Sequence, residues 1–158
     1  MAPRRPAVRL PFIYRIFFLV IEPISALVGA FYTHFKQPEY LQFLREEGVH
    51  TSGSISPATS VAMSQLANMY FFFALNEAIV LRSTWDMKVW KAVLFVLLVA
   101  DVGHLYSMRA LGPGIYYDVT NWNAGDMGNV PWVYAGAALR ICFLAGIGLG
   151  ERPVKERE

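Results

Sequence analysis

The sequence predicts an all-α membrane protein: an antiparallel bundle of four transmembrane helices, formed by one domain that covers residues 1–158. Apolar residues make up 55% of the chain and charged residues only 16%, which is too apolar for an ordinary soluble domain. The apolar residues gather in four blocks, each near the roughly 20 residues that a membrane-spanning helix needs. These blocks cover about 11–35, 57–81, 87–110 and 130–150, so no sizeable soluble domain remains.

The first block follows several arginines and must be distinguished from a secretory signal. Its apolar run is longer than that of a signal, and it contains Arg15, Glu22 and Pro23. We therefore expect a retained helix. Pro23 should kink this helix, because proline removes a backbone donor and neighbouring groups must then satisfy the freed carbonyl.

The distribution of positive charge predicts that both chain ends lie in the cytosol. With four spans, the two tails and the connection between the second and third spans share one side of the membrane. Most basic residues lie in or beside these regions: Arg4, Arg5, Arg9, Arg82, Lys88, Lys91, Arg152, Lys155 and Arg157. Cytosolic loops carry such an excess. We expect the endoplasmic reticulum as the location, and no nucleic acid as a partner, since no basic stripe is interleaved with exposed aromatics.

The connections define the order of the helices. The connection at 82–86 is short enough only for a tight turn, so the second and third helices should be antiparallel neighbours. The loop at 111–129 is rich in Gly, Asn and Asp, which suits tight turns; a structured lid over a cavity and a plain interfacial loop both fit it. The fourth helix should begin near Pro131 and continue to about residue 150.

Several ionisable side chains fall inside the predicted spans. Glu22, Asp101 and Arg140 lie near the predicted midplane, Glu77 about one turn inside the cytosolic interface, and His104 on the other side of centre. An unpaired charge at mid-depth costs about 3 kcal/mol on insertion scales. The sequence therefore predicts that Arg140 contacts Asp101, Glu22 or both.

Two interpretations of these residues remain open. In the first, Arg140 neutralises an acid while Asn, Gln and Ser side chains join the helices as structural contacts. In the second, the three acids Glu22, Glu77 and Asp101 outnumber the one arginine, so at least one acid lacks a cationic partner. Desolvation favours the protonated form of such an acid, and a protonated carboxyl in an apolar pocket can act as a general acid.

His104 and Asp101 are three residues apart and share one face of a helix. A carboxylate can orient and charge an imidazole, which suits catalysis, although an isolated histidine is commonly a packing residue. His34 and His50 lie away from His104, and the chain has no paired-cysteine or HExxH spacing, so we expect no metal. No phosphate-binding loop or dinucleotide fingerprint is present, so we expect no cofactor.

Three stretches carry a family resemblance: Pro23-Ile24-Ser25-Ala26-Leu27 after Glu22, Ala100-Asp101-x-Gly-His104, and the run from Asn121 to Asn129. The chain resembles a family of small four-helix integral-membrane proteins of filamentous fungi, and the resemblance covers most of its length. In size and style the chain is also similar to small membrane enzymes of fungal polyketide and meroterpenoid pathways, which open epoxides by hydrolysis or cyclisation. A looser likeness is to sterol-isomerase and sigma-2-receptor bundles.

The leading hypothesis is a cofactor-independent membrane enzyme that uses embedded carboxylates for acid–base catalysis on a hydrophobic substrate. The resemblance implies epoxide opening or isomerisation in fungal secondary metabolism. Its catalytic residues would be Asp101, Glu22, Glu77 and His104, and its substrate-orienting residues Asn68, Asn76, Arg140, Trp122 and Tyr106. Homodimer and pathway-enzyme contacts stay open.

The alternative is a non-catalytic membrane module that binds a lipid or sterol or scaffolds partner enzymes. A proton-coupled carrier is a third option, disfavoured by four helices without inverted repeats.

Overall fold

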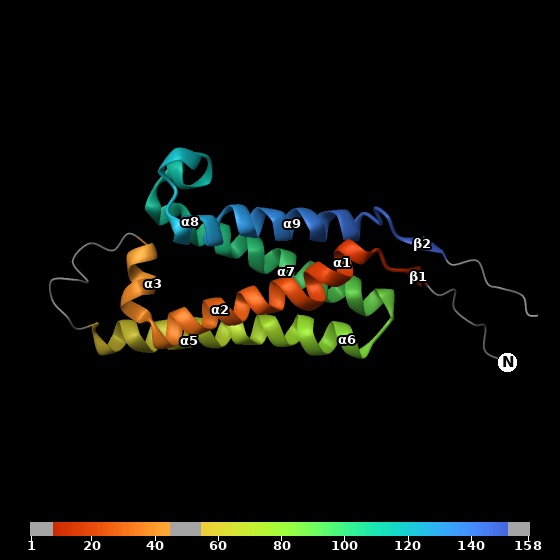
Figure 1. The fold of residues 1–158 in the computed structure, drawn as a ribbon, viewed down its shortest axis with the longest axis horizontal. Coiled ribbons are helices and arrows are strands. Elements are labelled where there is room, and N and C mark those ends of the chain that lie inside the picture. Colours follow the sequence, from red (N-terminus) through yellow and green to blue (C-terminus); the bar gives the residue numbers. More distant parts are fainter. Residues whose placement is uncertain (1–7, 45–54, 152–158) are drawn as a thin grey trace, which may run out of the picture.

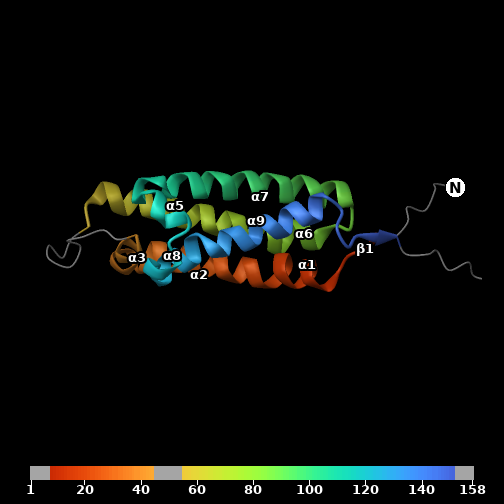
Figure 2. The ribbon, with the colours of Figure 1, turned by 90° about the horizontal axis from the view of Figure 1, so that it is seen from above.

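The computed structural model of this chain describes residues 8–44 and 55–151. Four long helical segments run along one axis, and Figures 1 and 2 show this from two directions. The first comprises α1 (Phe12–Ile16), the π-helix η1 (Phe17–Ile21) and α2 (Glu22–Phe35), and the second α5 (Pro57–Leu75), the π-helix η2 (Asn76–Val80) and α6 (Leu81–Ser83). The third is α7 (Met87–Ser107), and the fourth is α9 (Pro131–Leu144). The all-α class is confirmed.

Within the described residues, two helices are long and apolar enough to cross a membrane: Phe12–Phe35 and Met87–Leu111. The helix that begins with α5 is less apolar because polar residues such as Gln65 and Asn68 interrupt it. The helix α9 has 14 residues, and at 1.5 Å per residue it is about 21 Å long, shorter than a hydrocarbon core of about 30 Å. Length and composition thus mark two of the four segments as candidate spans.

The fourth helix is shorter than the sequence predicts. It ends at Leu144 rather than near residue 150, because Gly146 adopts a left-handed conformation with φ of 80°. The amide of Ile147 donates to the carbonyl of Cys142 and that of Gly146 to Phe143, both at 2.9 Å. This pattern is a Schellman motif, which terminates a helix and favours glycine at the left-handed position.

The two chain ends meet at one end of the bundle. The strand β1 (Val8–Arg9) pairs antiparallel with β2 (Gly150–Glu151), with Val8 opposite Glu151. In Figure 1 this pairing lies at the same end as α6 and the turn into α7. The paired strands and the turn into α7 therefore lie at the same end of the bundle.

An aromatic core fills the bundle near this end. It contains Tyr14, Phe17 and Phe18 from the first segment and Trp90, Leu94 and Leu97 from α7, together with Leu10, Leu81 and Phe143. The Phe143 ring packs edge-on against Tyr14, with ring centroids 5.2 Å apart. This core contains side chains from all four helical segments, so it holds the segments in position along the bundle axis.

Short helices close the opposite end. They are α3 (Gln37–Phe43), the 3-10 turns η3 (Met108–Leu111), η4 (Pro113–Tyr116) and η5 (Val119–Asn121), and α8 (Ala124–Asn129). Asn123 and Asp126 form a capping box at the start of α8. A Cβ on Gly125 would lie 2.3 Å from Cβ of Phe43, so only glycine allows α8 to approach α3 this closely. The predicted loop is therefore a structured cover.

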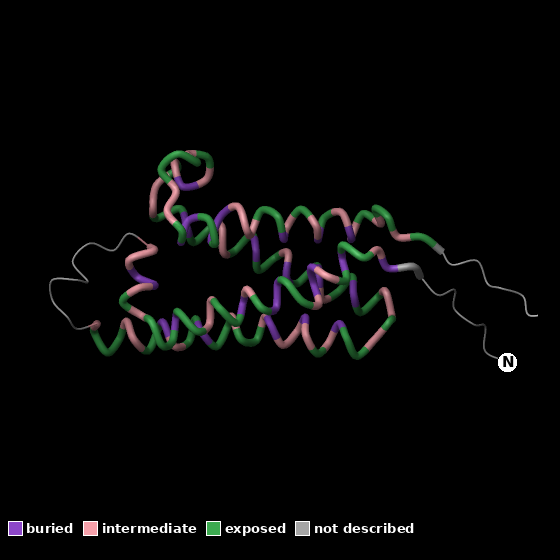
Figure 3. Tube along the Cα trace, viewed as in Figure 1, coloured by how far each residue is buried: buried purple, intermediate pink, exposed green. Residues whose placement is uncertain are grey.

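Many positions along the helices are exposed (Figure 3), and large apolar residues are among them. Exposed apolar residues recur along the helices and include Ile24, Val28, Phe31, Phe72, Phe95, Val96, Val99, Val102 and Ile141. Buried positions, in contrast, include Glu22, Glu77, Asp101 and Arg140. Charged residues are almost never fully buried unless they are paired, so these four are expected to contact one another.

Candidate functional site

Arg140 lies at the centre of a cluster of three acids, which we call the Arg140 cluster. Its Nη2 is 2.8 Å from Oε1 of Glu22 and 3.3 Å from Oε1 of Glu77. Its Nη1 is 2.8 Å from Oδ2 of Asp101. The side chains of Arg140 and Glu77 are fully buried, and those of Glu22 and Asp101 are 7% and 8% exposed. Each helical segment therefore contributes one charged residue to a single enclosed site.

Two π-helical segments place two of these acids. Glu22 directly follows η1, and Glu77 lies within η2. The extra residue in a π-turn rotates the following side chains relative to the preceding α-helix, and such turns are frequent at functional sites. The segments η1 and η2 contact each other across the bundle, so both irregular turns lie at the Arg140 cluster.

Pro23 adjoins the first of these turns. Proline has no amide hydrogen, so the carbonyl four residues earlier, that of Leu19, loses its helical donor. The Nη2 of Arg82 donates a hydrogen bond to that carbonyl. The prediction that a neighbouring group satisfies the carbonyl freed by Pro23 is therefore confirmed.

Two aromatic rings and a glycine complete the surroundings of the guanidinium. Its Cζ lies 5.6 Å from the ring centroid of Phe18 and 5.2 Å from that of Phe73, within cation–π range. Gly136 lies one turn before Arg140 on α9. A Cβ added at Gly136 would lie 2.8 Å from Nη1 of Arg140 and 3.0 Å from Oε1 of Glu22, so this glycine makes the space that the ion pair occupies.

The charges in the Arg140 cluster do not balance if every acid is ionised. One guanidinium and three carboxylates would leave a net charge of −2, from +1 and −3. Like charges this close disfavour full ionisation. The cluster is therefore arranged to hold at least one proton.

The structure confirms the predicted contacts of Arg140 with Asp101 and Glu22 and adds Glu77 as a third acid. It differs from the expectation that one acid lacks a cationic neighbour, because all three touch Arg140. Sequence reasoning missed the roles of Gly136, Phe18 and Phe73. The spacing of Gly136 and Arg140 by one helical turn was the available signal, since a small residue there opens room for the large side chain.

His104 lies apart from the Arg140 cluster. Its Nε2 is 3.2 Å from the backbone carbonyl of Asn129 in α8, whereas the carboxylate of Asp101 binds Arg140. The hydrogen bonds observed among the described residues do not connect His104 with Asp101. The two share a face of α7, but different neighbours engage them.

A cavity of about 260 Å³ opens beside His104, and we call it the His104 cavity. Residues from α3, α5, α7, η3 and α8 line it: Tyr40, Leu44, Leu66, Tyr70, His104, Ser107, Met108, Ala110, Leu111 and Asn129. The hydroxyls of Tyr40 and Tyr70 are 3.1 Å apart on its wall. The lining of the His104 cavity combines apolar and polar side chains, as expected of a small-molecule site.

The remaining predicted residues lie elsewhere. Asn76 donates to the carbonyl of Phe72 in its own helix, and Tyr106 is exposed, with the Arg109 guanidinium 3.8 Å from its ring centroid. The indole of Trp122 donates to the carbonyl of Ile115 within the covering loop. None of the three contacts Arg140 in the interactions described, so their substrate-orienting roles stay predictions without a common site.

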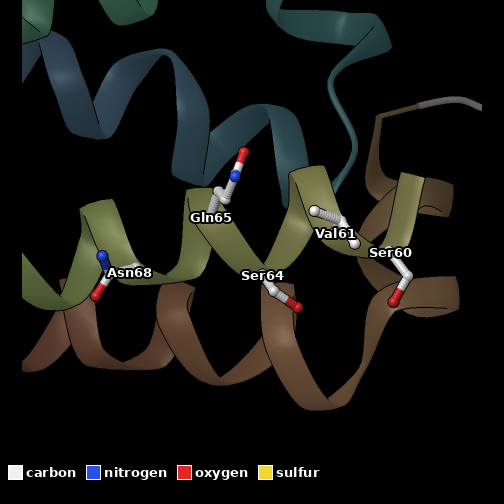
Figure 4. Close-up of a pocket in the computed structure, with 5 residues that line it drawn as sticks. All are labelled: Ser60, Val61, Ser64, Gln65 and Asn68. Carbon is white, nitrogen blue, oxygen red and sulfur yellow. The ribbon is translucent and has the colours of Figure 1, made fainter. Parts of the chain in front are cut away.

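Asn68 lines a shallow groove of about 300 Å³ on α5, together with Ser60, Val61, Ser64 and Gln65 (Figure 4). Ser64 and Gln65 point to different sides of the helix in this view. One helix supplies the whole lining, so the groove is a surface feature of α5. Elsewhere, the described residues include no group of three His, Cys, Asp or Glu side chains placed to hold a metal ion.

The fold and the site define a class: a small all-helical protein with apolar outer faces and a buried arginine–carboxyl cluster. Residues 7–150 match the family model described as a domain of unknown function, DUF7704, and the chain belongs to this family. No curated protein and no solved structure matches the chain.

Proposed function

We propose that all four helical segments cross a lipid bilayer, with both chain ends in the cytosol and the endoplasmic reticulum as the membrane. The exposed apolar residues on every long helix support this, because a contiguous apolar surface of that extent is rare on soluble monomers. The positive residues beside the paired strands and the α6–α7 turn support the orientation. The short helix α9 would be extended by α8, which directly precedes it.

We further propose that the protein is a cofactor-independent enzyme that performs acid–base chemistry on a hydrophobic substrate. The observation that carries this proposal is the sharing of one guanidinium by three buried carboxyls. Such a group holds a proton where water is scarce, and a neutral carboxyl paired with a carboxylate is the arrangement of a general acid and a general base. Glu22 and Asp101 keep a little exposed surface, so these two would face the substrate.

The resemblance of the sequence to fungal membrane proteins suggests epoxide opening, by hydrolysis or cyclisation, or isomerisation. In epoxide opening, a protonated carboxyl would donate its proton to the epoxide oxygen as the carbon–oxygen bond breaks. Water or an internal hydroxyl would attack the carbon and lose its proton to the second carboxylate. Glu77, which is fully enclosed, would retain its contact with Arg140 throughout.

The test is product analysis by mass spectrometry in a host that co-expresses the neighbouring pathway genes. We expect a product with the wild-type protein that disappears with Asp101→Asn and with Glu22→Gln at equal membrane abundance, measured by immunoblot. Ser64→Ala, on the outer groove of α5, is the matched control and should keep the product. An unchanged product profile in both acid variants would show that the acids are not catalytic.

One observation favours a second function, a non-catalytic membrane module that binds a lipid or sterol or scaffolds partner enzymes. All three acids lie within 3.3 Å of Arg140 and are almost fully enclosed, which also suits a structural ion cluster. Under this alternative, any phenotype of the acid variants should follow protein abundance in proportion. The immunoblot in the same experiment separates the two functions.

A further inference from the structure

We propose that the His104 cavity binds a neutral alcohol with an apolar body. This names a substrate or ligand site for the proposed function and rests on its premise that the protein handles hydrophobic molecules. The cavity lies one turn along α7 from Asp101, a rise of about 4.5 Å for three residues. His104 on the cavity wall is therefore one helical turn from the Arg140 cluster.

The lining favours an uncharged ligand. None of the residues that line the cavity is Asp, Glu, Lys or Arg, and half are apolar side chains: Leu44, Leu66, Met108, Ala110 and Leu111. A charged group would lose its hydration there without a partner, which costs several kcal/mol. At about 260 Å³ the cavity is just below the range of roughly 300–1,000 Å³ for drug-sized ligands, so it suits a small molecule or one end of a longer one.

The histidine side of the cavity offers an acceptor. The Nε2 of His104 is 3.2 Å from the carbonyl oxygen of Asn129. Because a carbonyl can only accept, this hydrogen bond places the proton of the neutral ring on Nε2 and leaves Nδ1 as the acceptor.

The tyrosine side offers a donor. The hydroxyls of Tyr40 and Tyr70 are 3.1 Å apart and form one hydrogen bond. Two hydroxyls carry two protons, and only one proton is used between them. The second proton can therefore be donated to an oxygen inside the cavity.

An alcohol complements both sides, since its oxygen accepts from the tyrosine pair and its proton is donated to His104. An ether or a ketone of the same shape can use only the tyrosine donor, and a hydrocarbon can use neither. A net hydrogen bond contributes about 1 kcal/mol, or roughly fivefold in affinity. The site thus predicts an affinity order of alcohol, methyl ether, hydrocarbon.

The experiment uses the full-length protein in lipid nanodiscs and a decanol derivative that carries a photoreactive diazirine. We expect cross-linked peptides from the cavity wall, and we expect decanol to compete about fivefold better than its methyl ether. Two variants remove hydrogen-bonding groups while keeping ring packing: His104→Phe, and the double variant Tyr40→Phe with Tyr70→Phe. Each should weaken competition by decanol about fivefold and leave competition by decane unchanged. Ser64→Ala, on the outer groove of α5, is the matched control.

Equal competition by decanol and decane, or labelling that stays unchanged in both variants, would overturn the proposal. Cross-linking confined to the outer helix faces would do the same, because it would report partition into lipid. Failure of the acid–base proposal has a different signature: alcohol binding persists with the expected variant pattern while Asp101→Asn leaves the product profile unchanged.

Discussion

Asp101 and His104 lie on successive turns of α7, yet their surroundings differ. The carboxylate of Asp101 is 2.8 Å from Arg140 within an almost fully enclosed cluster, whereas the His104 side chain lines a cavity and hydrogen-bonds to the covering helix α8. The difference comes from the helices opposite. Around Asp101, α9 packs Gly136 and Arg140 against the first two helical segments, and the bundle is closed. Around His104, α3 and α8 take the place of α9, and the His104 cavity remains open.

This comparison separates two ways in which a bundle can use polar residues. In the Arg140 cluster, the charged groups bind one another, and these contacts specify one arrangement of the four helical segments. In the His104 cavity, polar groups retain hydrogen-bonding capacity that a ligand can use. The predictions below test first the closed site and then its contrast with exposed charge.

The largest effect is expected from Arg140→Met, which removes the only cation of the cluster and retains an unbranched side chain. Removal of one partner from a buried ion pair costs about 3–5 kcal/mol, so we expect a correspondingly lower free energy of unfolding, measured by denaturant titration in detergent. Replacing Glu22, Glu77 and Asp101 by their amides in the same chain should recover much of the loss. Wild-type stability in Arg140→Met alone would contradict a structural role for the cluster.

A smaller effect is expected from Gly136→Ala. The new methyl group would lie 2.8 Å from Nη1 of Arg140 and 3.0 Å from Oε1 of Glu22, and overpacking typically costs about 1–3 kcal/mol. Gly103→Ala is the control, because a Cβ there meets nothing within 4 Å. Alanine favours a helix over glycine by about 1 kcal/mol, so the thermal midpoint should fall for Gly136→Ala and rise for Gly103→Ala. Equal shifts in the two variants would argue against close packing at Gly136.

Glu77→Gln should not destabilise the protein. The amide cannot ionise, and the carboxyls of Glu22 and Asp101 remain to neutralise Arg140, so repulsion among the acids cannot increase. The thermal midpoint in detergent should equal or exceed that of the wild type at neutral pH. A clear decrease would mean that Glu77 is ionised and that its charge is required.

The smallest effect is expected from Glu39→Gln in the exposed pair at the start of α3. The Glu39 carboxylate is 3.3 Å from Nζ of Lys36, and both side chains are about half exposed (44% and 50%). The backbone amide of its own residue and then Lys36 lower the pKa of Glu39 below its ordinary value. A lowered pKa stabilises the fold above the ordinary value, and this contribution is lost as pH falls through the folded pKa.

The wild-type thermal midpoint should therefore exceed that of Glu39→Gln by at most a small amount at neutral pH, and the two should converge in acid. Surface pairs of this kind add little because water screens them. A loss of stability as large as that of Arg140→Met would show that the exposed pair contributes as much as the buried cluster, contrary to this prediction.

The sequence carried enough information to predict much of the closed site. Three acids and one arginine in apolar stretches have few low-energy arrangements, so the pairing of Arg140 with Asp101 and Glu22 followed from the cost of burying charge. The inclusion of Glu77 did not follow, because α-helical geometry does not anticipate the π-turns η1 and η2 that rotate the acids inwards. Local sequence specifies such turns poorly, since they depend on contacts between segments.

The site around His104 was less predictable. A spacing of three residues placed Asp101 and His104 on one face and suggested a pair, but Arg140 engages the carboxylate and Asn129 the imidazole. Tyr40 and Tyr70 come from segments 30 residues apart, and their proximity follows from the packing of α3 against α5. Asn68 shares a helix with the cluster residue Glu77, yet it lies on an outer groove.

By itself, the sequence determined the all-helical class, the four apolar segments, the short α6–α7 turn and the presence of charge within the interior. These follow from composition and spacing, because burial of apolar groups and local backbone preferences act within single segments. The tertiary structure alone decided the third acid on Arg140, the space that Gly136 leaves for the ion pair and the cavity at His104. Each of these depends on which side chains from distant segments meet, and that is set by packing of the whole bundle.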